Sequence, residues 1–128
     1  MKQLQDLAHP IARIFLSVLF ILGGIGKLAN VEGFAQYMAS GGLPAALAWP
    51  AILFEILAGL ALLVGFQTRI VALALAGFSL VTAFLYHLVP ADQLQMAIFF
   101  KNIGLAGGYL MFFAYGAGNF SFDNKNKG

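Results

Sequence analysis

Four long apolar stretches run along the chain, and short polar or glycine- and proline-containing segments separate them. The stretches cover approximately residues 11–29, 45–64, 70–88 and 94–115. Each is close to the roughly 20 residues that an α-helix needs to cross the hydrocarbon core of a bilayer. The pattern predicts an all-α integral membrane protein: a four-helix bundle that forms a single domain over residues 1–128.

Residues with known helix-end preferences mark the boundaries of these stretches. Pro10 suits the first turn of a helix, where its missing N–H is not needed. Gly65 is a candidate C-cap of the second span and Thr68 a candidate N-cap of the third. The connection between these two spans is so short that their helices must be antiparallel neighbours. Asp92 followed by Gln95 is typical of a capping box that opens the fourth span.

The segment between the first two spans, residues 30–42, is too long for a turn. Asn30 can cap a short helix there, and Glu32 would stabilise its positive end. The apolar face of that helix would consist of Phe34, Tyr37 and Met38. We therefore expect an amphipathic helix lying in the membrane interface.

Two further boundaries remain to be placed. The second span can begin at Pro44 or, because Trp49 favours the interface, near Pro50. The tail, residues 119–128, is polar, and we expect it to be loose.

The low charge content strengthens the membrane prediction. Only 9% of the residues are charged, whereas a soluble domain carries about 25%. Seven basic residues stand against five acidic ones, and no basic run exists that could neutralise phosphates. The composition therefore predicts a protein dissolved in the lipid bilayer and excludes a nucleic-acid partner.

The absence of cysteine removes several kinds of chemistry. It excludes disulfides, thiolate zinc sites, iron–sulfur clusters and covalent c-type haem. His9 and His87 fall at opposite membrane faces, so they cannot ligate one haem within a monomer. We find no catalytic motif and expect neither a metal site nor a covalently bound cofactor, so the chain is more an accessory protein than an enzyme by itself.

Basic residues near the span ends predict the orientation. Only Lys27 and Lys101 lie towards one side, and five basic residues lie towards the other: Lys2, Arg13, Arg69, Lys125 and Lys127. The positive-inside rule then places both termini in the cytoplasm.

The candidate chemistry consists of polar side chains inside the spans. A charge in hydrocarbon costs at least about 2.5–3.5 kcal/mol, so such residues usually pair and usually mark a site. Glu55 is the natural counter-charge for Lys27 or Lys101. Helix rise puts these groups in the outer half of the bilayer. We expect one ligand-binding cluster made of Lys27, Glu55, His87, Lys101 and Asn102.

Structural roles compete with this interpretation. Lys27 can snorkel to the interface, and Arg13 is expected to snorkel to the cytoplasm. His87 can be a packing residue near the interface. Glu55 and Lys101 can form a pair that only fixes helix register. Gly104 and Gly108, on the face of Lys101, permit close helix contact and also suit a homodimer interface.

Several short motifs resemble the DoxX family of small four-span bacterial membrane proteins. The resemblance extends over residues 13–118, and the order and spacing of the motifs carry it. They occupy residues 20–28 (FILGGIGKL), 41–44, 55–63 (EILAGLALL), 65–69 (GFQTR), 82–87 (TAFLYH) and 100–108 (FKNIGLAGG).

The resemblance implies an inner-membrane protein that works beside redox enzymes. The family is named for a subunit of an archaeal terminal-oxidase or thiosulfate:quinone oxidoreductase assembly, and other members are associated with oxidative-stress tolerance. The first hypothesis is thus a non-catalytic membrane subunit that touches quinone or a partner in a membrane redox complex. The alternatives are a small-solute or proton transport protein gated by Glu55 and Lys101, and a structural scaffold.

Overall fold

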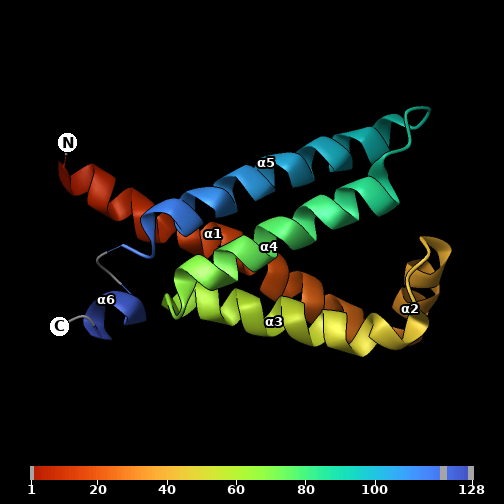
Figure 1. Ribbon diagram of the computed structural model, residues 1–128, viewed down its shortest axis with the longest axis horizontal. Helices are drawn as coiled ribbons and strands as arrows, with labels where there is room; N and C mark the ends of the chain where they lie inside the picture. Colours follow the sequence, from red (N-terminus) through yellow and green to blue (C-terminus); the bar gives the residue numbers. More distant parts are fainter. Residues whose placement is uncertain (1, 119–120, 127–128) are drawn as a thin grey trace. The chain divides into compact units, whose positions relative to one another are not determined.

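The computed structural model describes residues 2–118 and 121–126, and all the regular structure in these ranges is helical (Figure 1). Strands are absent from the described ranges. The elements, in chain order, are α1 (Lys2–Leu28), α2 (Val31–Ser40), the 3₁₀ turn η1 (Ala45–Leu47), α3 (Ala48–Val64), α4 (Thr68–Thr82), the π-helical turn η2 (Ala83–His87), α5 (Gln93–Tyr115) and α6 (Phe122–Asn126).

Four helical segments in the described residues are long and apolar enough to cross a membrane. They are Gln3–Leu28, Ala45–Val64, Thr68–His87 and Gln93–Tyr115. These segments coincide with the four apolar stretches of the sequence, which confirms the all-α, four-span prediction.

The start of the first helix differs from the prediction. α1 begins at Lys2, so Pro10 lies inside the helix and not in its first turn. Leu4, Leu7 and Ile11 extend the helical spacing of apolar residues back past the proline. The carbonyl of Asp6 consequently lacks its usual intrahelical donor, because proline has no N–H.

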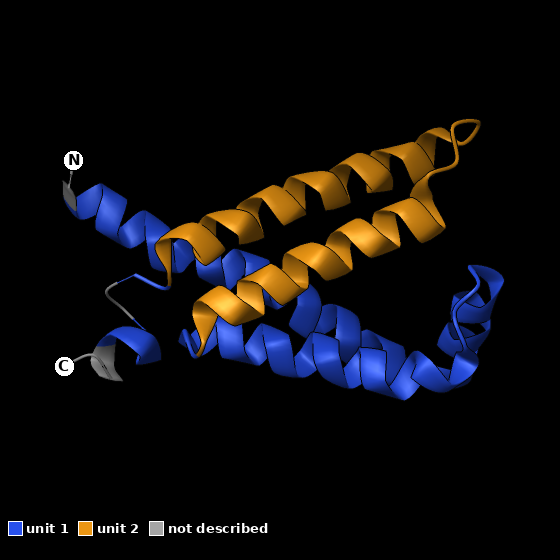
Figure 2. Cartoon of the chain, in the orientation of Figure 1, with its two compact units in different colours: residues 1–66, 117–128 blue, residues 67–116 orange. Residues whose placement is uncertain are grey.

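The chain divides into two compact units, and each contains one pair of long antiparallel helices (Figure 2). Unit 1 comprises residues 1–66 and 117–128, with the pair α1 and α3. Unit 2 comprises residues 67–116, with the pair α4 and α5. This division does not test the prediction of a single domain over residues 1–128, which stays a prediction.

Glycines bring α1 and α3 of unit 1 close together. A Cβ atom on Gly24 would lie 2.6 Å from Cγ1 of Ile56. A Cβ atom on Gly59 would lie 2.7 Å from Cγ1 of Ile21 and 3.2 Å from the carbonyl oxygen of Ser17. The two backbones therefore approach as closely as small-residue contacts allow in membrane helices.

We predict that Gly59→Leu lowers the free energy of unfolding by about 1–3 kcal/mol, because the new side chain would collide with the backbone of α1. Gly77→Leu in α4 is the control, since a Cβ atom there meets nothing within 4 Å. Thermal unfolding in mild detergent, followed by circular dichroism and by fluorescence of Trp49, measures both. Equal stability of the two variants would contradict the close packing.

The short helix predicted between the first two spans is present as α2. The side chain of Asn30 caps it by accepting a hydrogen bond from the N–H of Gly33 at 2.9 Å. Glu32 lies in its first turn, as the sequence indicated, and Met38 is buried.

Both prolines that the sequence offered as the start of the second span lie at the beginning of a helical element. Pro44 precedes η1, which begins at Ala45, and Pro50 lies in the first turn of α3. The segment is thus helical from just after Pro44, with a 3₁₀ turn before the regular α-helix.

The turn between α3 and α4 uses two left-handed residues. Gly65 (φ 76°) ends α3 as predicted, and the N–H of Phe66 donates to the carbonyl of Ala61 at 2.8 Å. Gln67 (φ 48°) is the residue that precedes α4, and Thr68 is already helical. The prediction of Thr68 as the cap was wrong by one residue, because the chain reverses through Gln67.

Part of the tail that the sequence predicted to be loose is folded onto unit 1. The N–H of Asp123 donates to the carbonyl oxygen of Gly65 at 2.8 Å. The rings of Phe66 and Phe122 meet edge to face, with centroids 5.5 Å apart. The end of α3 therefore offers α6 both an acceptor and an aromatic contact. Residues 119–120 and 127–128 of that tail lie outside the described residues.

Candidate functional site

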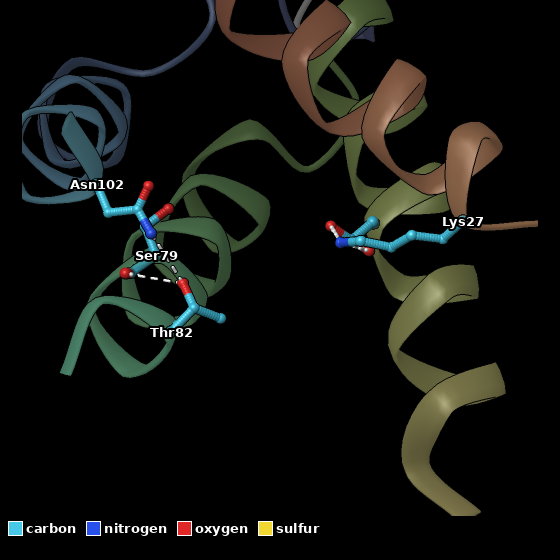
Figure 3. A network of polar contacts seen from close by, with 5 residues as sticks. Lys27, Ser79, Thr82 and Asn102 are labelled. Carbon is cyan, nitrogen blue, oxygen red and sulfur yellow. Dashed lines mark hydrogen bonds and ion pairs between the residues drawn. The ribbon is translucent and has the colours of Figure 1, made fainter. Parts of the chain in front are cut away.

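Unit 1 contains a close ion pair between its two long helices. Nζ of Lys27, in the last turn of α1, lies 2.7 Å from Oε1 and 2.8 Å from Oε2 of Glu55 on α3 (Figure 3). The Glu55 side chain is 5% exposed and that of Lys27 is 33% exposed. The Glu55 carboxylate is thus buried, and its counter-charge is the partly exposed ammonium group of Lys27. Lys27 therefore forms an ion pair within the protein, in addition to any contact with the membrane interface.

The surroundings of Lys27 leave room for a ligand acceptor. Nζ lies 4.7 Å from the centroid of the Phe34 ring, which α2 holds over the end of α1. An ammonium group has three donors, and the two contacts to Glu55 engage at most two of them. A cation next to an aromatic face, with a donor to spare and partial exposure, can bind a carbonyl or an anionic oxygen.

Asn102 belongs to a second polar network, inside unit 2. Its Nδ2 donates to Oγ1 of Thr82 at 3.1 Å, and Thr82 donates to the carbonyl of Ser79 at 3.1 Å (Figure 3). Ser79 is 2% exposed, and within the described residues its hydroxyl makes no hydrogen bond. This network carries no charge and joins α4 to α5.

His87 lies at the end of the π-helical turn, where α4 gives way to the loop before α5. Its Nδ1 is 2.7 Å from Oε1 of Gln95. An amide oxygen only accepts, so Nδ1 carries the proton in this contact. Oδ1 of Asp92 caps α5 as predicted, by accepting from the N–H of Leu94 at 3.0 Å. The Gln95 side chain bonds to the imidazole, so the expected capping box is only half formed.

Lys101 differs from the other candidate residues. It is exposed, and among the described residues it makes neither an ion pair nor a hydrogen bond. Lys27 and Glu55 are therefore paired in unit 1, whereas His87 and Asn102 have separate partners in unit 2. One cluster of all five residues stays a prediction. Within the described ranges, no group of three His, Asp or Glu side chains is placed to hold a metal ion.

The prediction that Arg13 snorkels to the cytoplasm was wrong. Arg13 is 3% exposed, and its Nη1 donates to the carbonyls of Leu62 and Leu63 at 3.3 and 3.0 Å. The last carbonyls of a helix lack intrahelical donors, and the negative end of the helix dipole attracts a cation. Arg13 thus closes the C-terminal end of α3.

Unit 2 repeats this arrangement. Nη1 of Arg69, near the start of α4, donates to the carbonyl of Ala114 at 3.0 Å at the end of α5. In each unit, the partner helix ends at a glycine with positive φ, Gly65 or Gly116. An arginine near the start of an apolar stretch and a glycine at the end of the next stretch form the sequence signal that could have indicated this contact.

The helices and the buried charges together define the class: an all-helical integral membrane protein with four spans. Inside the described spans, Lys27 and Glu55 pair with each other, and Arg13 and Arg69 each bind the carbonyl groups at the end of a partner helix. More specifically, the chain belongs to the DoxX family, whose model matches residues 9–88.

Relatives of similar length support this membership. The chain is 42% identical over 123 residues to inner membrane protein YqjF of Escherichia coli (strain K12). The matched region covers 96% of this chain and 95% of that protein. It is 34% identical over 122 residues to inner membrane protein YphA of the same organism, covering 90% and 87%. The resemblance to the DoxX family that the sequence motifs carried is confirmed.

A more distant relative has a redox name. Over 76 residues, 59% of this chain and 57% of the other, the chain is 30% identical to the Bacillus subtilis (strain 168) protein named "Putative oxidoreductase CatD". No solved structure matches the chain.

Proposed function

We propose that this chain is a non-catalytic membrane subunit of a quinone-linked redox system, and that the Lys27–Glu55 pair holds the quinone headgroup. The observation that carries the proposal is a buried carboxylate that fixes a partly exposed ammonium group beside an aromatic ring. Membership of the DoxX family and the oxidoreductase name of one relative support the redox context.

The residues at this site fit a quinone headgroup. Such a headgroup is a flat ring with carbonyl acceptors, and its apolar tail lies among the lipid chains. Lys27 would donate to one carbonyl, and Glu55 would hold the ammonium group in position. The ring of Phe34 would lie against the headgroup. A bound quinone supplies electron transfer between membrane-bound donors and acceptors, so the subunit needs no redox centre of its own.

We also propose that both termini lie in the cytoplasm, which places the Lys27–Glu55 pair in the outer half of the inner membrane. Arg13 and Arg69 support this orientation. Arg13 lies at the C-terminal end of α3 and Arg69 at the C-terminal end of α5, and basic residues favour the cytoplasmic side. Reporter fusions at the N-terminus and in the loop after His87 would test it. Activity of a cytoplasmic reporter in that loop would contradict the orientation.

Quinone content is the direct test of the ligand. The chain is purified in mild detergent, its lipids are extracted, and mass spectrometry counts quinone per chain. We expect nearly one quinone per wild-type chain and about a tenfold drop in Lys27→Met, because a hydrogen bond from a charged donor contributes about 1.5–3 kcal/mol. Glu32→Gln, which alters an exposed carboxylate on α2, is the control and should keep its quinone.

Two outcomes would count against this function. Wild-type chain that contains no quinone, or Lys27→Met that retains it, would remove the ligand assignment. Proton or solute flux through liposomes that contain the chain alone, lost in Glu55→Gln, would favour the transport alternative instead.

A further inference from the structure

The ion pair of unit 1 offers a ligand a charged hydrogen-bond donor. Nζ of Lys27 lies 2.7 Å from Oε1 and 2.8 Å from Oε2 of Glu55, so both carboxylate oxygens already contact the same ammonium group. An ammonium group has three N–H donors and no acceptor. A headgroup that binds at Lys27 therefore meets a group that can donate a hydrogen bond but cannot accept one.

The helix α2 adds an aromatic ring to the same ammonium group. The centroid of the Phe34 ring lies 4.7 Å from Nζ of Lys27. Local hydrogen bonds fix the position of Phe34, because its N–H donates to the carbonyl of Asn30 at 3.2 Å while the Asn30 side chain caps the helix. The faces of an aromatic ring carry partial negative charge. All of these groups belong to unit 1, so their arrangement depends on that unit alone.

The two redox forms of a quinone differ in what they present to such a donor. Reduction by two electrons and two protons converts each carbonyl oxygen into a hydroxyl group. A carbonyl oxygen only accepts hydrogen bonds, whereas a hydroxyl group also carries a proton that needs an acceptor. An ammonium group cannot be that acceptor. A polar group that lacks its partner away from water is costly, so the reduced form is the poorer ligand.

We propose that Lys27 makes this site selective for the oxidised form of the quinone, and that Glu55 and Phe34 are positioning residues that hold the ammonium group. The inference rests on the proposed function, because it takes Lys27 as the group that binds the headgroup. It adds a direction to that function: the site loads with quinone and releases quinol, since a carbonyl oxygen is the better partner for a charged donor.

Binding of the two forms to the purified chain tests this selectivity. The probe is decyl-benzoquinone, added either as the quinone or, under argon, as its quinol. The full-length chain is immobilised in mild detergent, and mass spectrometry counts the retained probe over a range of concentrations. We expect the quinone to bind about tenfold more tightly than the quinol, towards the lower end of the effect that one unpaired polar group has.

The midpoint potential of the bound probe is an independent readout. Tighter binding of the oxidised form makes its reduction harder, so a tenfold preference lowers the midpoint potential by about 30 mV for a two-electron couple. A redox titration of the loaded chain, followed by the absorbance of the quinone, measures this shift against the probe in empty detergent micelles.

Variants at the ion pair separate the charge from the rest of the site. Lys27→Arg keeps a group with donors and no acceptor, so it is the matched control and should keep the preference. Lys27→Gln combined with Glu55→Gln leaves two neutral amides, which both donate and accept. We expect this double variant to bind the two forms with affinities within about twofold of each other. The ratio of the two dissociation constants in the wild-type chain decides the proposal even where a variant does not fold.

Two results would overturn the selectivity and leave the ligand assignment in place. One is binding of quinone and quinol to the wild-type chain with equal affinity, or of quinol more tightly. The other is a preference for quinone that the double variant retains, which would assign the preference to other groups. Absence of binding of either form would instead remove the proposed function, and this inference with it.

Discussion

Replacing Arg13 with methionine is expected to lower the free energy of unfolding by about 2–3 kcal/mol. The methionine would fill similar volume but leave the carbonyls of Leu62 and Leu63 without their donor. A buried acceptor that loses its partner costs about 1–3 kcal/mol, and bonds to charged groups lie at the upper end. Thermal unfolding in mild detergent measures the change.

Arg69→Met is the matched control for this prediction. Arg69 makes the same kind of contact, from Nη1 to the carbonyl of Ala114, but it is exposed, so water can replace the lost donor. We expect a loss below about 1 kcal/mol for Arg69→Met. Comparable losses in the two variants would show that burial does not set the strength of these contacts.

Glu55→Gln is expected to destabilise the chain by about 2 kcal/mol. The substitution leaves the Lys27 ammonium group without its counter-charge between α1 and α3. A fully buried pair would lose about 3–5 kcal/mol, but Lys27 is one third exposed and can turn towards water. The fluorescence of Trp49, at the start of α3 in the same unit, follows the unfolding.

The double variant Glu55→Gln with Lys27→Met tests whether the pair itself is stabilising. Because the double variant leaves no unpaired charge, we expect it to recover most of the lost stability. A double variant as unstable as Glu55→Gln would mean that Glu55 stabilises the unit through contacts other than Lys27.

The sequence was sufficient for features that depend on nearby residues. Span length and apolar composition set the four helices, and Asn30, Gly65 and Asp92 act within one helical turn of their own position. The α2 helix followed from Asn30 and the apolar residues after it. Such signals are local, so they can be identified in the sequence without knowledge of the tertiary fold.

The features that the sequence did not reveal depend on residues far apart in the chain. Arg13 carries no local sign that the end of α3, about 50 residues later, needs its guanidinium group. Glu55 had two candidate lysines, and only the packing of α1 on α3 selected Lys27. The position of Gln95 fits a capping box, but its side chain forms a hydrogen bond with the imidazole of His87 on the other side of the loop.

The contact between α6 and the end of α3 has a consequence for how the protein is made. The ribosome completes α1 and α3 first and then α4 and α5, while the residues that contact Gly65 emerge last. The end of α3 near Gly65 therefore lacks its contact with α6 until the whole polypeptide has left the ribosome. We expect newly synthesised chains to become protease-resistant near Gly65 only after termination, later than the rest of the same hairpin.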